Sequence, residues 1–538
     1  TVPETLGNLT ELEYMDFGGN MLSGDLPQVV TSSSWWQKSG WVCIEQNSPG
    51  GFNFDTFNLY MPDFTATDYR GNTINSSSIV ASHKVTLYYI WASWCSFSKA
   101  FHPTVSSIYQ RYKNHSLEII GLCSDGTENP VDAANTIESN NMEWPTLMSN
   151  PGGISYSGFP TIMAFDETGK LIFHSSVTSR SLLPDFLKGI LGEGDLPYES
   201  SDFSEDGKVY TLQQASEGNG INVVLMGDAF SDRQIADGTY EEVMRTAADA
   251  FFSEEPYTSF RNLFNVYYVT AVSKNEGYVD GGSTVFSGYF SGGTHVGGDD
   301  NKCMQYAATC PEMTDPLMNE VLIIVMMNST LYAGTCYWGS SSAYQGDYGR
   351  GYGIAYFPIG TSDEDLASVL HHEAGGHGFA KLEDEYYYES KGTIPSSEIS
   401  RNIDFRNRYG WGRNVDYTSD PNSVVWSKFI SDSRYASEGL GVYEGACTYY
   451  KGAYRPTETS IMVGNVGGFN APSREAIYNR IHKLAYGESW QFDYETFVSW
   501  DLSRQGRSRT MPSQTKYKPT APPVILNQHW ENGRLVAN

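Results

Sequence analysis

Two histidines and a glutamate near the middle of this chain have the types and the order of a metal-dependent hydrolytic site. The stretch 361–386 reads TSDEDLASVLHHEAGGHGFAKLEDEY, in which His372 and Glu373 are followed by His377. Imidazole groups are common ligands of Zn²⁺, and a glutamate beside a ligand histidine can take a proton from water at such an ion. The residue types therefore indicate a metallopeptidase site.

The spacing of the two histidines departs from the usual H-E-x-x-H motif, in which the rings are four residues apart. Here the spacing is five, which on a regular α-helix is a rotation of about 500° and leaves the rings roughly 140° apart. A π-bulge would realign them, and the small residues 374–376 offer little resistance to it. We therefore predict a widened turn between Glu373 and His377. His371 is a competing first ligand that fits no better, and we expect it to be packed or hydrogen-bonded behind the site.

A catalytic zinc ion needs a third protein ligand and an open position. By distance along the chain after His377, three acids qualify: Glu383, Asp384 and Glu385. The series His-His-Glu-Ala-Gly-Gly-His-Gly-Phe, Lys-Leu and Asp-Glu-Tyr resembles the motif of the IgA-peptidase-like metzincins, or igalysins. That resemblance implies Asp384 as the third ligand and leaves Glu383 as the alternative. It also shows a departure, because Ala380 stands where the family motif usually turns at glycine.

A second segment supports the same resemblance. Residues 459–464 (TSIMVG) with 467–472 (GGFNAP) look like the metzincin Met-turn, with Met462 as a hydrophobic floor beneath the metal. The resemblance covers roughly residues 209–500. It implies peptide-bond hydrolysis with one catalytic Zn²⁺ and Glu373 as the general base.

The segments before this site alternate between strand and helix patterns. Strands are predicted at 221–230, 265–272, 320–328 and 353–360, and a helix at 240–252. A mixed sheet whose last strand leads into the metal-binding helix is the arrangement expected of a zincin, and its edge could bind an extended substrate. Glycine- and tyrosine-rich loops at 278–300 and 332–352 are expected to rim the cleft. Asp299 and Asp300 in the first loop are candidates for a structural Ca²⁺ site, although a solvated turn is the main expectation.

The preceding part of the chain resembles a different fold. A buried-strand pattern at 85–94 runs into Cys95 at a helix start, and Phe159-Pro160-Thr161 precedes a hairpin that turns at 166–169. These features resemble the thioredoxin fold of secreted bacterial thiol-disulfide proteins, which have C-x-x-C and a cis-proline there. Ser98 replaces the second cysteine, so two-thiol redox cycling is excluded. Cys95 remains a candidate for mixed disulfides, and a scaffold or protein-binding role is the main expectation.

Residues 6–27 have the spacing of one leucine-rich repeat, which cannot bury its own face. Either further repeats precede it or it caps the next domain. We therefore expect an α/β multidomain chain with a leucine-rich-repeat remnant at 1–30, a thioredoxin-like domain at 45–192 and a linker at 193–208. A zincin-like or metzincin-like metallopeptidase domain with a mixed sheet and an active-site helix would follow at 209–500. The extension 501–538 contains the strand-like VILNQHW and is a candidate docked strand.

The amino-acid composition limits the classes of molecule that this chain is expected to bind. The 35 basic and 63 acidic residues give a net charge of −28, which disfavours nucleic acid and anionic membranes. No apolar run is long enough to span a bilayer. The seven cysteines are too few for a disulfide scaffold, although one or two bridges are open among Cys303, Cys310, Cys336 and Cys447. Richness in Tyr, Gly, Ser and Asn fits an exported bacterial protein, secreted or at the cell surface.

Two hypotheses follow. The first is a secreted zinc endopeptidase whose substrates are extracellular proteins or peptides, with host glycoproteins and immunoglobulins as candidates. The second is an extracellular adhesion or binding protein with a catalytically inactive protease domain and a redox-inactive thioredoxin module. The intact set of His372, Glu373, His377 and Asp384 favours the first. The sequence does not indicate an oligomeric state.

Overall fold

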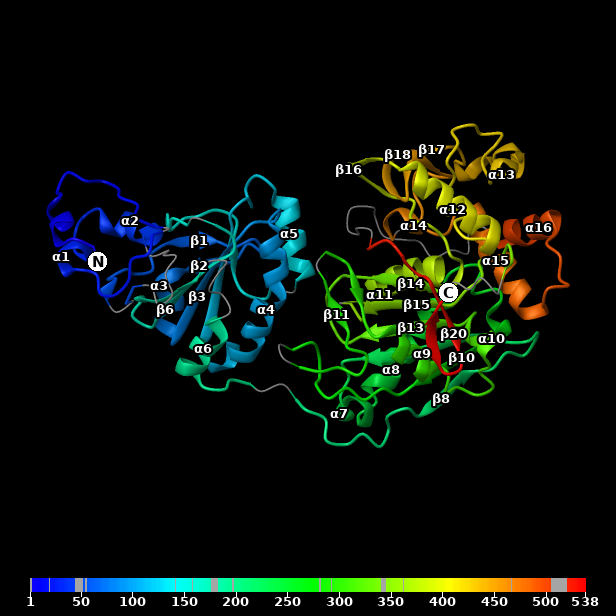
Figure 1. The fold of residues 1–538 in the computed structure, drawn as a ribbon, viewed down its shortest axis with the longest axis horizontal. Helices are drawn as coiled ribbons and strands as arrows, with labels where there is room; N and C mark the ends of the chain where they lie inside the picture. The colour runs from blue at the N-terminus through cyan, green and yellow to red at the C-terminus, as the bar shows by residue number, and fades with distance from the viewer. Residues whose placement is uncertain are drawn as a thin grey trace. The chain divides into compact units, whose positions relative to one another are not determined.

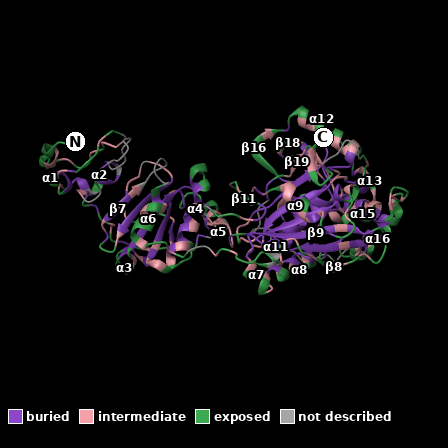
Figure 2. Ribbon diagram, turned by 60° about the horizontal axis from the view of Figure 1, so that its bottom comes forward, coloured by how far each residue is buried: buried purple, intermediate pink, exposed green. Residues whose placement is uncertain are grey.

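The computed structural model describes the chain apart from residues 1, 19, 44–51, 54–55, 141, 157, 176–181, 196–197, 280–281, 292, 340–344, 361, 466 and 505–519 (Figure 1). The chain divides into two compact units, residues 1–197 and residues 198–538. Each unit has its own sheet and its own buried core, as the purple strands of Figure 2 show.

The first unit is built on a five-stranded sheet with the order β5-β4-β3-β6-β7. Its strands are β3 (Val85–Trp91), β4 (Leu117–Cys123), β5 (Thr146–Leu147), β6 (Thr161–Asp166) and β7 (Leu171–Ser175). The first three are parallel, whereas β6 and β7 are antiparallel to their neighbours. β3 is buried along its whole length because alternate residues point to two covered faces.

Helices cover one of these faces, and the N-terminal segment packs on the other. The covering helices are α4 (Ser96–Tyr112), α5 (Pro130–Ser139) and α6 (Leu183–Leu191). The helix α3 (Ser76–Ser82) and a short hairpin of β1 (Thr65–Thr67) and β2 (Thr73–Asn75) pack on the side of the N-terminal segment. Leu87 and Tyr89 lie in a core with α4 and α6, and Tyr88 and Ile90 lie in a core with Leu26 and other N-terminal residues.

The N-terminal segment contains a 3₁₀ turn (Glu4–Asn8), α1 (Gln28–Thr31) and α2 (Trp36–Cys43). A leucine-rich repeat is not shown by its described residues. The expected leucines are used differently, since Leu26 is buried in the core beneath the five-stranded sheet and Leu12 and Leu22 pack against that core. The segment thus covers a face of the neighbouring sheet.

The second unit is built on a seven-stranded mixed sheet with the order β19-β14-β15-β13-β9-β10-β8. Its strands are β8 (Val209–Gln213), β9 (Ile221–Asp228), β10 (Phe264–Val269), β13 (Leu322–Met327), β14 (Thr335–Gly339), β15 (Gly353–Pro358) and β19 (Val524–Leu526). The strands β10, β9, β13 and β15 are parallel, β8 and β14 are antiparallel to their neighbours, and β19 is parallel to β14. The mixed sheet predicted from sequence is confirmed.

Both faces of this sheet are covered. One face packs on α7 (Asp232–Ala236), α8 (Thr239–Phe251), α11 (Asp363–Leu370) and α15 (Ala471–Tyr486). The other packs on α9 (Asp300–Ala307), α10 (Asp315–Met318) and a hairpin of β20 (Gln528–Glu531) and β21 (Arg534–Ala537). The alternation within β13 follows this division, with Ile324 facing the first core and Val325 the second.

A smaller part of the second unit is formed after residue 379, where the helical segment that continues α11 ends. Its sheet has the order β16-β18-β17, with β16 (Tyr387–Thr393), β18 (Thr448–Arg455) and β17 (Tyr443–Ala446). The remaining elements are β11 (Tyr289–Phe290), β12 (Val296–Gly297), α12 (Ser396–Tyr409), α13 (Ser427–Ser431), α14 (Ile461–Gly464) and α16 (Tyr494–Arg504).

The structure can be compared with three further expectations from the sequence. The segment 332–352 is not a loop throughout, because residues 335–339 form β14 within the large sheet; residues 340–344 lie outside the described part. All seven cysteines are buried and free, so the considered disulfide bridges are not formed. Across the described residues, the helices are too short or too polar to cross a membrane.

We predict that Gly353→Ala destabilises the second unit. A Cβ at Gly353 would lie 2.3 Å from the carbonyl oxygen of Gly378. The strand β15 and the helical segment that contains Gly378 (His371–Phe379) would therefore have to separate. Such overpacking costs about 1–3 kcal/mol of unfolding free energy. Urea denaturation should show this loss, whereas Gly464→Ala, which adds a Cβ with nothing within 4 Å, should stay close to the parent protein. Equal midpoints for the two variants would contradict the close packing.

Candidate metal centre

A change of helix type brings the two histidines, which are five residues apart, onto the same side of the helix. The helix α11 continues into a π-helix, His371–Phe379, instead of ending or staying regular. In a π-helix the hydrogen-bonded turn closes at residue i+5, so residues five apart share one face. The rings of His372 and His377 accordingly lie 4.6 Å apart between centroids. The predicted widened turn is confirmed, and it extends over the whole segment.

Close packing explains why glycine stands at several positions of the π-helix. A Cβ at Gly376 would lie 2.3 Å from the Sδ atom of Met462, and one at Gly378 would lie 2.7 Å from a methyl group of Leu322. The hydroxyl of Tyr257 donates a hydrogen bond of 2.7 Å to the Gly375 carbonyl oxygen. The widened turns therefore fit tightly between the sheet below and the segment that carries Met462.

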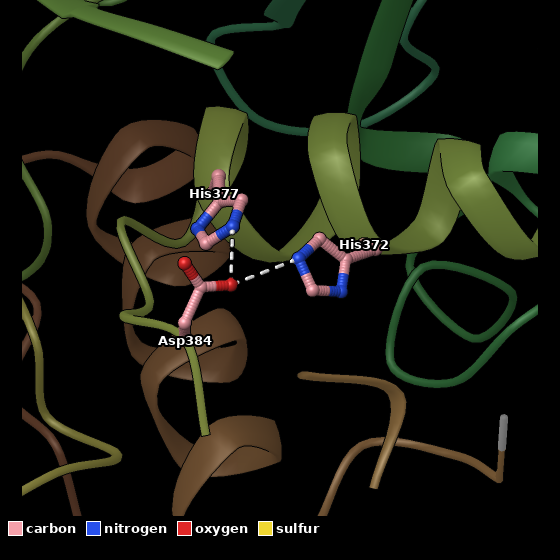
Figure 3. Close-up of side chains that lie close together, drawn as sticks. All are labelled: His372, His377 and Asp384. Atoms are coloured by element: carbon pink, nitrogen blue, oxygen red, sulfur yellow. Dashed lines mark hydrogen bonds and ion pairs between the residues drawn. The ribbon is translucent and has the colours of Figure 1, made fainter. Parts of the chain in front are cut away.

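Two imidazoles and one carboxylate converge in the buried interior beside this helix (Figure 3). The Nε2 atoms of His372 and His377 each lie 3.2 Å from Oδ1 of Asp384. Ligand atoms of the three residues all lie within 4.8 Å of one another, and among the described residues no other group of His, Cys, Asp and Glu meets this condition. The structure thus brings together three of the residues that the sequence pointed to.

The hydrogen bonds behind the rings determine which nitrogen faces the centre. Nδ1 of His372 lies 2.9 Å from the carbonyl oxygen of Ile461, and Nδ1 of His377 lies 2.7 Å from that of Leu382. Because a carbonyl can only accept, each Nδ1 carries the hydrogen and each Nε2 of a neutral ring presents a lone pair. In neutral rings, two lone pairs then face the Asp384 carboxylate at 3.2 Å, and this repulsion is removed by a cation between them or by a proton on Nε2.

This donor set fits a zinc ion. Two imidazole nitrogens and one carboxylate oxygen are a common protein contribution to a catalytic zinc site. In addition, Nε2 of His377 and Oδ2 of Asp384 are buried without a hydrogen-bond partner among the described residues. Buried polar atoms without a partner are costly, and a cation would satisfy these.

Asp384 reaches the centre through a turn that does not need the glycine of the family motif. Ala380 keeps a right-handed helical conformation, and Lys381 takes the left-handed one with φ of 54°. Burial alone would raise the pKa of Asp384, but the positive charge that His377 and His372 carry when protonated holds that pKa below its usual value.

The side chain of Glu383, the alternative ligand, points away from the three converging residues. Its side chain passes Gly412, where an added Cβ would lie 3.1 Å from Cγ of Glu383, and its backbone nitrogen donates to Asn414 at 2.9 Å. It is not among the three residues whose ligand atoms converge. Burial raises the pKa of Glu383 to about 7.

Glu385 has a role that the sequence did not single out. Its buried carboxylate accepts hydrogen bonds from Ser460 (2.6 Å), Asn414 (2.9 Å) and Asn470 (2.9 and 3.0 Å). Its backbone nitrogen donates to the carbonyl oxygen of Met462 at 2.9 Å. Glu385 therefore ties the segment of Asp384 to the segment of Met462. The sequence gave it only as one acid among three, because its partners lie far along the chain.

Glu373 lies fully buried at the same centre. Burial raises the pKa of its carboxyl to about 8, and the nearby Asp384 adds to the rise while His372 and the Thr520 hydroxyl oppose it. A pKa near neutrality suits a group that takes and returns a proton.

The other candidates have separate roles. Nε2 of His371 lies 2.6 Å from the Ala250 carbonyl oxygen at the end of α8, as expected for a residue behind the site. Asp299 caps α9 by accepting from the Lys302 backbone nitrogen, and Asp300 accepts a hydrogen bond of 2.8 Å from Tyr356. These two acids have structural partners and do not join a group of candidate metal ligands.

In the first unit, Cys95 is the residue before α4 and is buried. Its Sγ atom lies 3.8 Å from the carbonyl oxygen of Phe159, and the Phe159-Pro160 bond is cis. The structure thus brings the thiol next to the predicted proline loop. Ser98 is buried in the first turn of the same helix.

Comparison with known families agrees with both units. Residues 210–436 match the family model described as IgA Peptidase M64, and residues 83–148 match a thioredoxin-like model. The chain therefore carries an N-terminal thioredoxin-like domain and an M64 peptidase domain. The segment of Met462 lies beyond the matched range.

Individual relatives were found for the thioredoxin-like fold. The thiol-disulfide oxidoreductase ResA of Bacillus cereus is 26% identical over 115 residues, which is 21% of this chain and 64% of the relative. ResA of Bacillus thuringiensis is 26% identical over 134 residues, 24% of this chain and 75% of the relative. The crystal structure of the thioredoxin domain of a thiol-disulfide oxidoreductase from Bacteroides vulgatus is 22% identical, with a TM-score of 0.22, over 24% of this chain and 95% of that one.

We predict that Glu385→Gln lowers the unfolding free energy of the peptidase domain by about 1–3 kcal/mol, because an amide leaves at least one buried donor unpaired. Chemical denaturation measures the change. Glu383→Gln is the matched control, since its side chain takes no part in the bonds to Ser460, Asn414 and Asn470. A loss of similar size in both variants would show that the network around Glu385 contributes nothing specific.

Proposed function

We propose that this chain is a zinc-dependent endopeptidase that is exported and hydrolyses extracellular proteins. The observation that supports it most strongly is the convergence of two imidazole nitrogens and one carboxylate oxygen whose lone pairs face each other at 3.2 Å. Such an arrangement is unfavourable without a cation and favourable with one. The M64 peptidase match supports peptide-bond hydrolysis as the reaction class.

In this mechanism His372, His377 and Asp384 hold the ion. When bound, Zn²⁺ supplies a Lewis acid for the scissile carbonyl and lowers the pKa of a water molecule. Glu373 would take a proton from the attacking water at a carboxylate oxygen and would return it to the leaving amine. The carbonyl oxygens of Ile461 and Leu382 keep both rings in the required tautomer.

The substrate class in this proposal is protein or peptide. The family description names immunoglobulin A, which makes immunoglobulins and other host glycoproteins candidates. A binding protein with an inactive protease domain is the competing function. It is disfavoured because the buried carboxylate of Glu373 and the three candidate ligands are all retained in one place.

The first test separates the base from the metal ligands. We predict that Glu373→Gln lowers kcat/KM on casein by about 10²–10⁴-fold, the usual contribution of a general base. The variant should still bind one zinc ion, because Glu373 is not among the converging ligands. Zinc content by mass spectrometry and a casein digestion assay check both statements. A metal-free, inert parent chain that binds a protein ligand would instead favour the binding function.

The second test identifies the third ligand. We predict that Asp384→Asn weakens zinc binding by more than about 100-fold, beyond the usual effect of losing a partner outside the ligand set. Glu383→Gln should leave the affinity close to that of the parent chain. A competition titration with a chromogenic chelator measures both values. The assignment of Asp384 fails if Glu383→Gln shows the larger loss.

A further inference from the structure

The C-terminal segment of the chain lies at the candidate metal centre. Thr520 is fully buried, and its carbonyl oxygen accepts a hydrogen bond of 2.7 Å from the hydroxyl of Tyr386, two residues beyond Asp384. A main-chain carbonyl from residue 520 therefore stands beside the groups proposed for catalysis.

From this point the segment follows the outer edge of the large sheet. The backbone nitrogen of Ala521 donates to the carbonyl oxygen of Gly334 at 3.1 Å. Residues 524–526 then pair in parallel with 337–339 as β19 beside β14 (red in Figure 1). β14 starts beside the candidate metal centre, since a Cβ on Gly334, the residue directly before β14, would lie 2.9 Å from Oε1 of Glu373.

This is the path that an extended peptide would take. Peptides often bind by adding a strand to a free sheet edge, with main-chain hydrogen bonds that do not depend on sequence. Without the segment 520–526, β14 would be the outermost strand of the sheet on the side of the catalytic groups. The segment therefore fills the position of a substrate strand.

The candidate metal centre is closed to solvent in this structure. His372, Glu373 and His377 have 0% of their surface exposed, and Asp384 has 1%. Thr520, also at 0%, is held beside Tyr386, two residues beyond Asp384. The peptide bond of a substrate can reach these side chains only if a segment of the chain that covers them moves.

The segment is held by two unequal attachments. Beyond β19, Trp530 is buried in the core on the other face of the sheet, and Asn319 bonds to both its backbone nitrogen and its carbonyl oxygen at 2.8 Å. Between Ala521 and β19 stand Pro522 and Pro523, which have no N–H to donate to β14. The anchor at Trp530 is therefore firm, and the part near Glu373 is weakly paired.

We propose that residues 520–526 occupy the peptide-binding edge of this domain in place of a substrate and thereby inhibit it from within the same chain. The inference rests on the proposed peptidase function. The ligand class of the edge is an extended peptide main chain. A tethered segment acts at an effective concentration on the order of millimolar, so a segment with a dissociation constant of about 0.1 mM would lower activity about tenfold.

The test compares the full zinc-loaded chain with a chain that ends at Arg504 and with the full-length variant Trp530→Ala. Both changes should raise kcat/KM on casein, by about tenfold for the shortened chain. The matched control is His529→Ala, because the described contact of the His529 side chain is a hydrogen bond to Asn538 near the surface, and its loss should leave activity unchanged. A synthetic peptide of residues 518–527 should inhibit the shortened chain in competition with substrate.

A second readout does not require activity. The same peptide, labelled with a fluorophore, should bind metal-free shortened chain carrying Glu373→Gln and should not bind the metal-free full-length chain. If the shortened chain does not fold by circular dichroism, Trp530→Ala replaces it in both assays. Equal kcat/KM in released and complete chains, together with no peptide binding, would overturn the inference. If every form is inert but the peptide binds only released chains, the peptidase function fails and the occupied edge stands.

Discussion

The candidate metal centre depends on a helix that has more residues per turn than an α-helix. His372 and His377 can share one ligand point only because residues 371–379 form a π-helix. Such a helix is rare since its hydrogen bonds are less favourable, so surrounding contacts must stabilise it. Here they do so by fit: the sheet contacts Gly378, and Met462 contacts Gly376 so closely that no side chain could be present at either position.

The segment around Met462 links the helix, the ligands and their tautomers. Met462 limits the helix on one side, and the adjacent Ile461 carbonyl orients the ring of His372. The same segment is bound by Glu385, the residue directly after Asp384. A displacement of this turn would therefore change the helix, one imidazole and the carboxylate together. Through this coupling, a methionine outside the candidate ligand set contacts the elements that place all three candidate ligands.

The sequence predicted those features that depend on residues close together along the chain. Strand periodicity located β9, β10, β13 and β15, and the glycines at 375 and 376 indicated the widened turn. It could not identify β14, because Tyr337 and Trp338 belong to a glycine- and tyrosine-rich stretch that reads as a loop. Nor could it connect Glu385 with Asn470, or Thr520 with Tyr386, since these contacts join residues 85 and 134 positions apart. Only the folded sheet brings such residues together.

The edge of the sheet presents opposing requirements. A free edge exposes unpaired N–H and C=O groups and invites association with other strands, so proteins usually cover it. A peptidase that binds extended peptides needs that same edge to be available. A cover built from the chain itself meets both requirements if it pairs weakly near the catalytic groups and is anchored farther away. Pro522 and Pro523 reduce the pairing of this cover with β14, and the buried Trp530 keeps the cover close when it is released. The C-terminal segment is therefore consistent with a protein that protects its edge and can still open it.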